Sequence, residues 1–452
     1  MPKQLNKKMA YRRELPDWSS EYLDPELETM SREEIEKLQV ERLRETVSRC
    51  MNNPVYRKRL EEAGVSADNI TSVSDIRRIP FTTKEDLRNN YPFGLASAPL
   101  EECVRLHSSS GTTGNPTVIL HTQNDLDEWA NQVARNLWMV GLRPNDVFQN
   151  SSGYGMFTGG LGFQYGAERL GMLTVPAAAG NSLRQIKFIK DFGTTAIHAI
   201  PSYVTRLHEV MMQQGVDPRR DTKLKVLAIG AEPHSEEQRK RIEEMMGVKA
   251  YNSFGMSEMC GPGVGFECPE QNGLHFWEDY YIVEIVNPDT LEPVPDGEIG
   301  ELVLTTLQRE AMPLLRYRTR DLTRVLGRSC PCGRNHIRLD RMRGRSDDMI
   351  VLRGVNIFPI QIEKILMKFP ELGTNYLITL TTEDNNDQMT IEVELNEGTD
   401  DYSKLQALEK EIRHQVGDEI LLKPRIRLVA KGSLPVSEGK AVRVVDKRKV
   451  YQ

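Results

Sequence analysis

The chain has 452 residues, 39% hydrophobic and 27% charged, so it can bury sizeable cores and is not expected to be disordered. Its 59 basic and 65 acidic residues give a net charge of -6, which argues against nucleic acid as the main partner. It has neither an apolar run of about 18 residues nor a leader-like N-terminus, so we expect no membrane partner and a cytoplasmic chain whose cysteines are reduced.

Helices dominate the first part of the chain. Ser31 and Glu34 form a capping box, and apolar residues follow them at helical spacing, which predicts an amphipathic helix over residues 31–51. A short helix is expected at residues 55–63, and another after the turn at residues 80–83. These helices are interpreted as packing elements without chemistry.

Residues 108–117 combine hydroxyl side chains with glycines, directly before an apolar strand at residues 118–120. Hydroxyls and backbone N–H groups can donate to phosphate oxygens, and glycines allow a ligand to approach closely. The alternative is a Ser/Gly linker, which would not run straight into Pro116 and a buried strand. The stretch lacks the Gly-Lys-Ser/Thr ending of the common NTPase P-loop. We interpret it as a phosphate-binding loop of another kind.

After a helix expected at residues 126–140, residues 153–162 are dense in glycine and contain Tyr154 and Phe157. Glycines such as Gly159 and Gly160 allow close approach, and aromatic rings provide flat apolar walls, which predicts a pocket for a ring-bearing substrate. The alternative is that these glycines merely let helices pack. The stretch contains no lysine or arginine, which favours a neutral aryl acid over a dicarboxylic acid.

Short apolar strands alternate with helices from residue 171 to residue 253, which predicts a parallel sheet covered by helices on both faces. Ligands gather at the carboxyl ends of such strands, so residues 230–233 and 252–258 are expected at one edge. The second segment offers Phe254 to stack on a base, Ser257 to bind a phosphate and Glu258 to hold a hard cation.

Two further regions follow. Residues 280–305 predict a small β-rich subdomain, and a compact α+β unit of alternating helices and strands begins near Asp347. We therefore expect two domains, residues 1–346 and 347–452. Asp321, which stands between arginines, is a candidate binding carboxylate, with a surface ion pair as the alternative.

Three cysteines and a histidine predict a structural zinc site. Cys268 and His275 are seven residues apart, and Cys330 and Cys332 share a tight turn. Thiolates and imidazoles in groups of four bind zinc tetrahedrally. Cys260 and His336 are competing ligands, and scattered reduced thiols are the alternative. The sequence leaves these choices open.

Over about residues 30–450 the chain resembles the acyl-adenylate-forming enzymes, and in particular their phenylacetate–CoA ligase branch. The stretches that carry this resemblance to the branch are residues 81–84, 90–94, 157–162, 165–171, 344–350, 353–356 and 437–443. The resemblance implies an α/β fold. A large N-terminal domain with mixed and parallel sheets and a β-rich subdomain would be followed by a small mobile α+β domain.

The resemblance also assigns roles. The implied nucleotide-binding residues are Ser108, Ser109, Ser110, Gly111, Thr112, Thr113, Gly114, Ala231, Glu232, Pro233, Phe254, Gly255, Met256, Asp321, Arg345, Asp347 and Gly354. Ser257 would contact the α-phosphate and Glu258 would hold Mg²⁺. Lys440 matches the C-terminal lysine that bridges the substrate carboxylate and ATP. Asn115 stands where the family loop usually ends in lysine, so the loop has one cation fewer.

The implied activity is ATP-dependent ligation of an aryl-acetic acid to coenzyme A, in which an acyl adenylate forms and pyrophosphate is released. A homodimer is left open. One alternative is an adenylating enzyme that acts on another acid or on a cofactor. A non-catalytic nucleotide-binding protein is another, although pure binding would require neither Glu258 nor Lys440.

Overall fold

The computed structural model describes residues 15–109, 116–156, 158–346, 349–353, 355–383, 386–396, 402–435 and 442–448. A nine-stranded sheet lies at its centre, in the order β13-β14-β9-β8-β7-β6-β5-β3-β4. Its strands are β3 (Val147–Asn150), β4 (Leu173–Val175), β5 (Ala196–Ala199), β6 (Val226–Gly230), β7 (Lys249–Phe254), β8 (Gly265–Glu267), β9 (Leu274–Phe276), β13 (Val325–Gly327) and β14 (Arg338–Leu339). Strands β4, β3, β5, β6 and β7 are parallel, and the remaining strands extend this sheet in antiparallel fashion.

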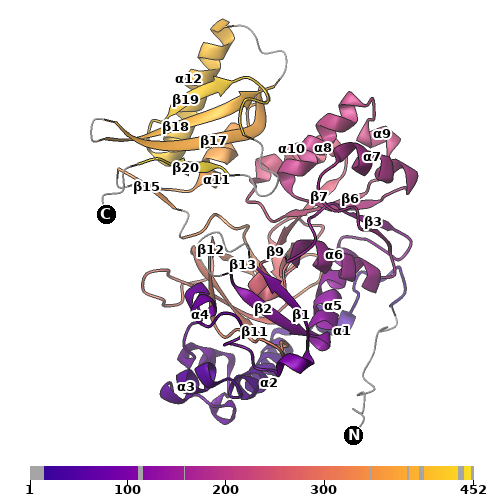
Figure 1. Ribbon diagram of the computed structural model, residues 1–452, viewed down its shortest axis with the longest axis vertical. Helices are drawn as coiled ribbons and strands as arrows, with labels where there is room; N and C mark the ends of the chain where they lie inside the picture. Colours follow the sequence, from indigo (N-terminus) through magenta and orange to yellow (C-terminus); the bar gives the residue numbers. More distant parts are fainter. Residues whose placement is uncertain are drawn as a thin grey trace.

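Helices cover both faces of the parallel half, as the alternation of strands and helices predicts (Figure 1). They are α5 (Gln123–Met139), α6 (Thr158–Arg169), α7 (Ser182–Asp191), α8 (Pro201–Gln213), α9 (Pro218–Asp221) and α10 (Glu236–Met246). Ala228 belongs to the hydrophobic cluster that contains α5 and α6, whereas its neighbours Leu227 and Ile229 belong to the cluster with α7, α8 and α10. Because successive side chains of a strand point to opposite faces, each face has its own helical layer.

Smaller units surround this sheet. Strands β1 (Cys103–Ser108) and β2 (Val118–Thr122) form an antiparallel pair, and β10 (Tyr281–Val286), β11 (Gly300–Thr306) and β12 (Tyr317–Thr323) form the predicted β-rich subdomain. The N-terminal helices are α1 (Pro25–Glu28), α2 (Arg32–Cys50), α3 (Pro54–Glu62) and α4 (Lys84–Asn89). Short 3-10 turns complete the region: η1 (Ala67–Asn69), η2 (Val73–Arg78), η3 (Leu100–Glu102) and η4 (Ser257–Met259).

The C-terminal part has its own core. A four-stranded sheet has the order β19-β18-β17-β20, and a two-stranded sheet pairs β15 with β16. The elements are β15 (Ile350–Leu352), β16 (Val355–Ile357), α11 (Pro359–Leu366), β17 (Leu372–Glu383), β18 (Asn386–Leu395), α12 (Tyr402–Ile420), β19 (Arg425–Val429) and β20 (Val444–Asp446). Their buried side chains form a hydrophobic cluster separate from the others.

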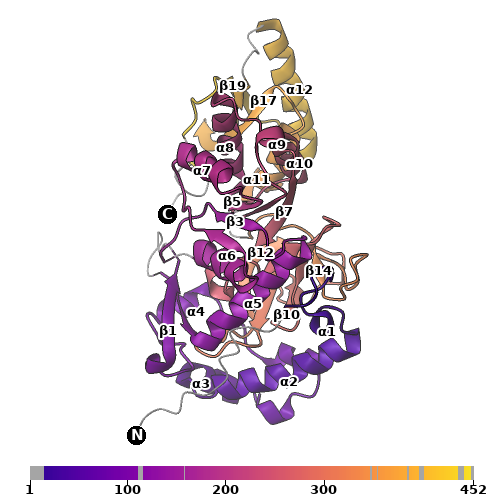
Figure 2. The ribbon, with the colours of Figure 1, turned by 90° about the vertical axis from the view of Figure 1, so that its right-hand side faces the viewer.

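The two views place this C-terminal part beside the helices of the parallel half, and α11 packs on α10 (Figures 1 and 2). The α/β fold class is confirmed, and the capping box predicted at Ser31 is present. The helix expected after the turn at residues 80–83 begins with a capping box at Thr83. The domain boundary near Asp347 stays a prediction, and Asp347 itself lies outside the described residues. Within the described ranges, no helix is both long and apolar enough to cross a bilayer.

Candidate functional site

The base of the expected phosphate loop is held by one strand pairing and two hydrogen bonds. Ser108 pairs with Val118 at the end of the β1–β2 ladder. The Ser109 N–H then donates to the Thr117 carbonyl at 3.0 Å, and the Thr117 N–H donates to Ser109 Oγ at 3.0 Å. Residues 110–115, which include Ser110, Gly111, Thr112, Thr113, Gly114 and Asn115, lie outside the described residues. The two ends of the loop are therefore fixed next to each other.

The tertiary fold brings this loop to the carboxylate predicted to hold a cation. Thr117 Oγ1 donates to Glu258 Oε1 at 3.0 Å, and both residues are buried. Glu258 lies in η4, directly after β7, and its carbonyl accepts from Arg309 Nη1 at 2.5 Å. Because one carboxylate oxygen has this hydroxyl as its partner, the side chain of Glu258 is oriented toward the loop.

Tyr317 links Glu258 to the predicted ribose site. Burial raises the pKa of the Tyr317 hydroxyl well above its usual value, and the Glu258 carboxylate raises it further. Arg345 opposes this shift and Asp321 adds to it. Asp321 and Arg345 are themselves paired by an isolated antiparallel bridge. Glu258, Asp321 and Arg345, all singled out in the sequence, thus influence the pKa of the same hydroxyl. The three residues therefore lie in one region.

The carboxyl ends of β6 and β7 form the predicted adenine edge. Gly230 pairs with Ser253, and a Cβ on Gly230 would lie 2.2 Å from the Ser253 carbonyl oxygen, so no larger residue fits. Ala231 follows with a φ of +65°, and Pro233 is exposed. The Glu232 carboxylate accepts from the backbone N–H and the hydroxyl of Ser202, at 3.0 and 2.8 Å. It is therefore oriented toward the first turn of α8.

The residues that follow β7 lie at the same edge. Phe254 is half-buried, and its ring centroid is 5.8 Å from that of Phe276. Gly255 is exposed, whereas Met256 and Ser257 are partly exposed. The Ser257 hydroxyl and the Phe254 ring are thus within reach of solvent, as side chains that contact a nucleotide must be.

The glycine-rich stretch lies beside the phosphate loop, because the Ser108 N–H donates to the Met156 carbonyl at 3.0 Å. Tyr154 is half-buried, and its hydroxyl accepts from Asn150 Nδ2 at 3.1 Å. Gly159 and Gly160 open helix α6. A Cβ on Gly160 would lie 2.6 Å from a backbone carbonyl, whereas one on Gly159 would meet no atom within 4 Å. Packing explains Gly160, and Phe157 lies outside the described residues.

A neutral aromatic cluster stands behind this stretch. His107, His121 and Trp129 are buried, with ring centroids 5.5 to 5.8 Å apart. Burial lowers the pKa of both histidines, so they are uncharged near neutral pH. A Cβ on Gly162 would lie 2.5 Å from the Trp129 ring, so this glycine lets α6 pack directly on the cluster.

The four predicted zinc ligands converge, although 64 residues separate the first from the last in the chain. Cys268, His275, Cys330 and Cys332 place one donor atom each within 4.8 Å of the others. They lie at the antiparallel end of the nine-stranded sheet, outside the three-stranded subdomain near which the sequence placed them. Cys268 follows β8, His275 is in β9, and the other two follow β13.

Two donor–donor distances in this cluster match those around a tetrahedral zinc ion. Zinc bonds of about 2.3 Å to sulfur and 2.05 Å to nitrogen imply edges of about 3.8 Å for S···S and about 3.6 Å for S···N. The Cys268 and Cys330 sulfurs are 3.7 Å apart, and Cys332 Sγ is 3.5 Å from His275 Nε2. The donor set and the spacing therefore suit zinc.

The competing ligands are engaged elsewhere. His336 Nδ1 accepts from the Glu278 N–H at 3.0 Å, and its Nε2 lies 2.8 Å from the Leu27 carbonyl oxygen. The Cys260 sulfur accepts from Arg309 Nε and Nη2 at 3.2 and 2.9 Å. Neither side chain belongs to the cluster of four.

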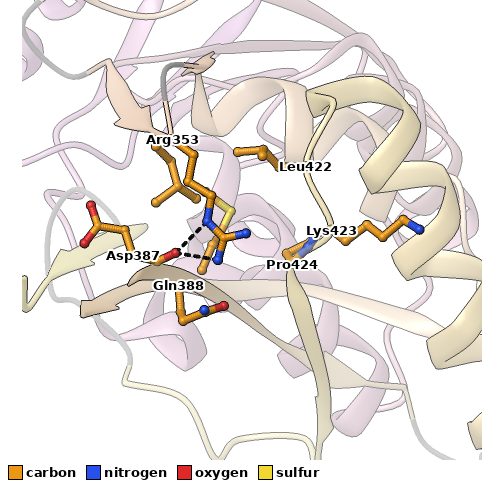
Figure 3. Close-up of a pocket in the computed structure, with 8 residues that line it drawn as sticks. Arg353, Asp387, Gln388, Leu422, Lys423 and Pro424 are labelled. Atoms are coloured by element: carbon orange, nitrogen blue, oxygen red, sulfur yellow. Dashed lines mark hydrogen bonds between the residues drawn. The ribbon is translucent and has the colours of Figure 1, made fainter. Parts of the chain in front are cut away.

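The C-terminal part contributes less to the described site. Asp347, Gly354 and Lys440 lie outside the described residues. Figure 3 shows a small cavity there, where Arg353 donates from Nε and Nη2 to the Asp387 carbonyl at 3.0 and 2.8 Å. Its volume of about 10 Å³ is far too small for a nucleotide.

The sequence placed Thr117 in the phosphate loop without assigning it a role of its own, and it did not mark Tyr317 or Arg309 as site residues. Thr117 is the last hydroxyl residue of the loop, and Tyr317 precedes Asp321 by four residues, so proximity to a motif was an available signal for both. Arg309 has no such signal, because it reaches Glu258 only through the tertiary fold. His107 and His121 likewise have no sequence signal, because the tertiary fold brings them together with Trp129.

Two family profiles match the chain. The AMP-binding enzyme profile matches residues 34–308, and the AMP-binding enzyme C-terminal domain profile matches residues 354–448. A phenylacetate-coenzyme A ligase of Thermus thermophilus is 45% identical, over 94% of this chain and 99% of its own length. The phenylacetate-coenzyme A ligase of Escherichia coli strain K12 is 44% identical, over 95% and 98%.

Solved structures agree with this similarity. A 2-hydroxyisobutyryl-CoA ligase in the postadenylation state, in complex with 2-HIB-AMP, is 31% identical and superposes with a TM-score of 0.90, covering 96% of this chain and 94% of its own. The same ligase in the thioesterification state, with 2-HIB-AMP and CoA, has a TM-score of 0.72 over the same shares.

Proposed function

Because the chain belongs to the AMP-binding enzyme family, as an AMP-forming acid–CoA ligase, we propose that its acid is phenylacetate or a close aryl-acetic acid. The acid would be activated as an acyl adenylate with release of pyrophosphate, and the coenzyme A thiol would then attack the activated carbonyl. The observation that carries this proposal is the identity of 44–45% with two phenylacetate-coenzyme A ligases, over nearly the full length of all three chains.

We assign the nucleotide to the edge formed by β6, β7 and the β1–β2 loop. Residues 108–114 would bind the pyrophosphate part of ATP, residues 231–233 and 254–256 the adenine, and Asp321 with Arg345 the ribose. Ser257 would contact the α-phosphate. The contact between Thr117 and Glu258 supports this arrangement, because it joins the phosphate loop to the segment after β7.

Charge is the main obstacle to the first half-reaction, since a carboxylate must approach the anionic phosphates of ATP. Glu258 is the residue proposed to hold Mg²⁺, which would neutralise phosphate charge when bound. Lys440 is proposed to bridge the substrate carboxylate and ATP. Asp347 and Gly354 are proposed to bind the nucleotide, with Asp347 at the hinge between the two domains. Lys440, Asp347 and Gly354 lie outside the described residues, so their roles rest on the sequence.

A neutral ring fits the surroundings of the glycine-rich stretch. The proposed substrate residues are Tyr154, Phe157, Gly159 and Gly160. The uncharged cluster of His107, His121 and Trp129 contacts the same segment at Met156 and Gly162. Gly160 also has a packing role, so its contribution would be indirect. An aromatic ligand meeting such rings edge-to-face would gain about 0.5–1.5 kcal/mol beyond simple burial.

We further propose one structural zinc ion, held by Cys268, His275, Cys330 and Cys332. The spacing of the donor atoms supports it, and the four protein ligands would leave no open position for chemistry. Its contribution would therefore be to join β8, β9 and the turn after β13.

A pyrophosphate-release screen tests the substrate. Phenylacetate, benzoate, 2-hydroxyisobutyrate and octanoate are compared, with and without coenzyme A. We expect the highest specificity constant for phenylacetate and a thioester product only with coenzyme A. A higher value for 2-hydroxyisobutyrate, the acid named for the structural relative, would refute the aryl assignment. Adenylate without a thioester would indicate an adenylating enzyme that passes its product elsewhere, and no turnover would indicate a binding protein.

A further inference from the structure

The buried carboxylate of Glu363, in the C-terminal part, contacts the large domain next to the proposed nucleotide-binding edge. Glu363, in α11, is 2% exposed, and its Oε1 accepts from the Ser235 N–H at 2.8 Å. Ser235 is the N-cap of α10 and follows Pro233, the last residue of the proposed adenine segment, by two positions. The contact therefore joins the two parts of the chain directly behind that segment.

The C-terminal part holds this carboxylate in place from the other side. The Tyr376 hydroxyl donates to Glu363 Oε2 at 3.0 Å. Arg443 lies over the Tyr376 ring, 4.5 Å from its centroid, and donates to Asn375 Oδ1 at 3.0 Å. Burial raises the pKa of the Glu363 carboxyl, while Arg443 and the two hydrogen bonds oppose that shift. Each carboxylate oxygen thus has one partner, and the two partners come from different parts of the chain.

Other contacts between the C-terminal part and α8 and α10 are expected to contribute less than the Ser235–Glu363 bond. Arg241 Nη2 donates to the Leu372 carbonyl at 2.7 Å. Lys431 lies 3.4 Å from Glu209 in a partly exposed pair, whose side chains are 38% and 29% exposed. An exposed pair contributes little because water and salt screen it, whereas a buried hydrogen bond to a charge is costly to lose. Among these contacts, the bond from the Ser235 N–H to the Glu363 carboxyl is the buried one that a side chain of the C-terminal part accepts.

The arrangement of the two parts matches one state of a relative better than another. The TM-score to the 2-hydroxyisobutyryl-CoA ligase is 0.90 in its postadenylation state and 0.72 in its thioesterification state and in its open conformation. The arrangement that contains the Ser235–Glu363 bond is therefore that of the postadenylation state.

We propose that Glu363 is a positioning residue that stabilises this arrangement of the two domains, and thereby favours adenylation over thioesterification. The inference rests on the proposed function only in that its activity assays need an acid that the enzyme adenylates. Glu363 does not touch the reacting atoms in this proposal; it acts through the Ser235 N–H and the segment that precedes it.

The test separates the two half-reactions in Glu363→Ala. Adenylation is followed by ATP–pyrophosphate exchange, and thioesterification by thioester formation from supplied acyl adenylate. We expect exchange to fall about ten-fold to a hundred-fold, because the buried Ser235 N–H loses its acceptor, and thioesterification to stay within about two-fold. Glu363→Gln keeps an oxygen that accepts the Ser235 N–H and should recover most of the exchange. Lys431→Ala, the matched control for the partly exposed pair, should leave both reactions unchanged.

A structural readout makes the result independent of the substrate. Small-angle X-ray scattering of the full chain should fit this structure for the wild type and for Lys431→Ala, and should deviate from it for Glu363→Ala. Equal losses in both half-reactions, or unchanged exchange and scattering in Glu363→Ala, would overturn the inference. If the wild type adenylates no acid at all, the proposed function fails, and the scattering comparison still decides the role of Glu363.

Discussion

The hydrogen bond between Thr117 and Glu258 permits a sharp test of the site. Thr117→Val keeps the size and branching of the side chain and removes only the hydroxyl, which donates to Glu258 Oε1 at 3.0 Å. Thr117 is fully buried and Glu258 is 6% exposed, so water replaces this donor poorly. A hydrogen bond to a charged group contributes about 1.5–3 kcal/mol, which corresponds to about ten-fold to a hundred-fold in rate or affinity.

We expect the loss to appear in adenylation. Without its donor, the Glu258 carboxylate is no longer oriented toward the loop, so pyrophosphate exchange at limiting Mg²⁺ should fall by that factor. Thr117→Ser should recover most of the exchange, since it restores the hydroxyl. Initial rates are measured over a series of Mg²⁺ and ATP concentrations, together with the melting temperature of each variant.

A matched control separates this effect from general destabilisation. Thr194 is also buried, and its hydroxyl donates to Gln149 Oε1 at 2.9 Å, near the amino end of β5 and thus at the opposite edge of the sheet. Thr194→Val should lower the melting temperature and leave the dependence on Mg²⁺ unchanged. If both variants have the same kinetics, or if Thr117→Val keeps full exchange, the proposed role of the contact is wrong.

Three further predictions concern other parts of the site. Lys440→Ala should slow acyl-adenylate formation by about 100-fold or more while thioester formation from supplied acyl adenylate survives; equal losses in the two assays would contradict the split role. Elemental analysis of protein purified without chelator should find about one zinc per chain, and Cys268→Ser should lower the free energy of unfolding more than turnover, because a closed four-ligand site is structural. Zinc-free wild type would rule that site out. Phe157→Ala should raise the Michaelis constant for phenylacetate about ten-fold and that for ATP less than two-fold, and a uniform rise would argue against a contact with the ring.

Local pattern was sufficient for most of the secondary structure. The structure contains the capping box at Ser31, the helix expected after residues 80–83, and the alternation of strands and helices over residues 171–253. Each of these features depends on residues a few positions apart, because helix caps and strand periodicity are local interactions. The family resemblance rested on motifs of the same short range, and it was confirmed over both family profiles.

The glycine-rich stretch shows where local pattern is ambiguous. Glycine permits both close approach of a ligand and close packing of helices, and the sequence does not distinguish these uses. In the structure, Gly162 lies against Trp129, whereas Gly159 faces open space at the start of α6. The choice between the two interpretations depends on the partner, which comes from a distant segment.

Tertiary structure alone decided how the distant segments meet. The sequence marked Glu258 and the phosphate loop separately, but only folding joins them through Thr117, 141 residues away from its partner. It also set the four proposed zinc ligands apart from His336 and Cys260, which have partners elsewhere. It brought Glu363 to Ser235 across 128 residues. Such contacts arise because whole helices and strands pack against one another. No local sequence pattern near either residue therefore predicts them.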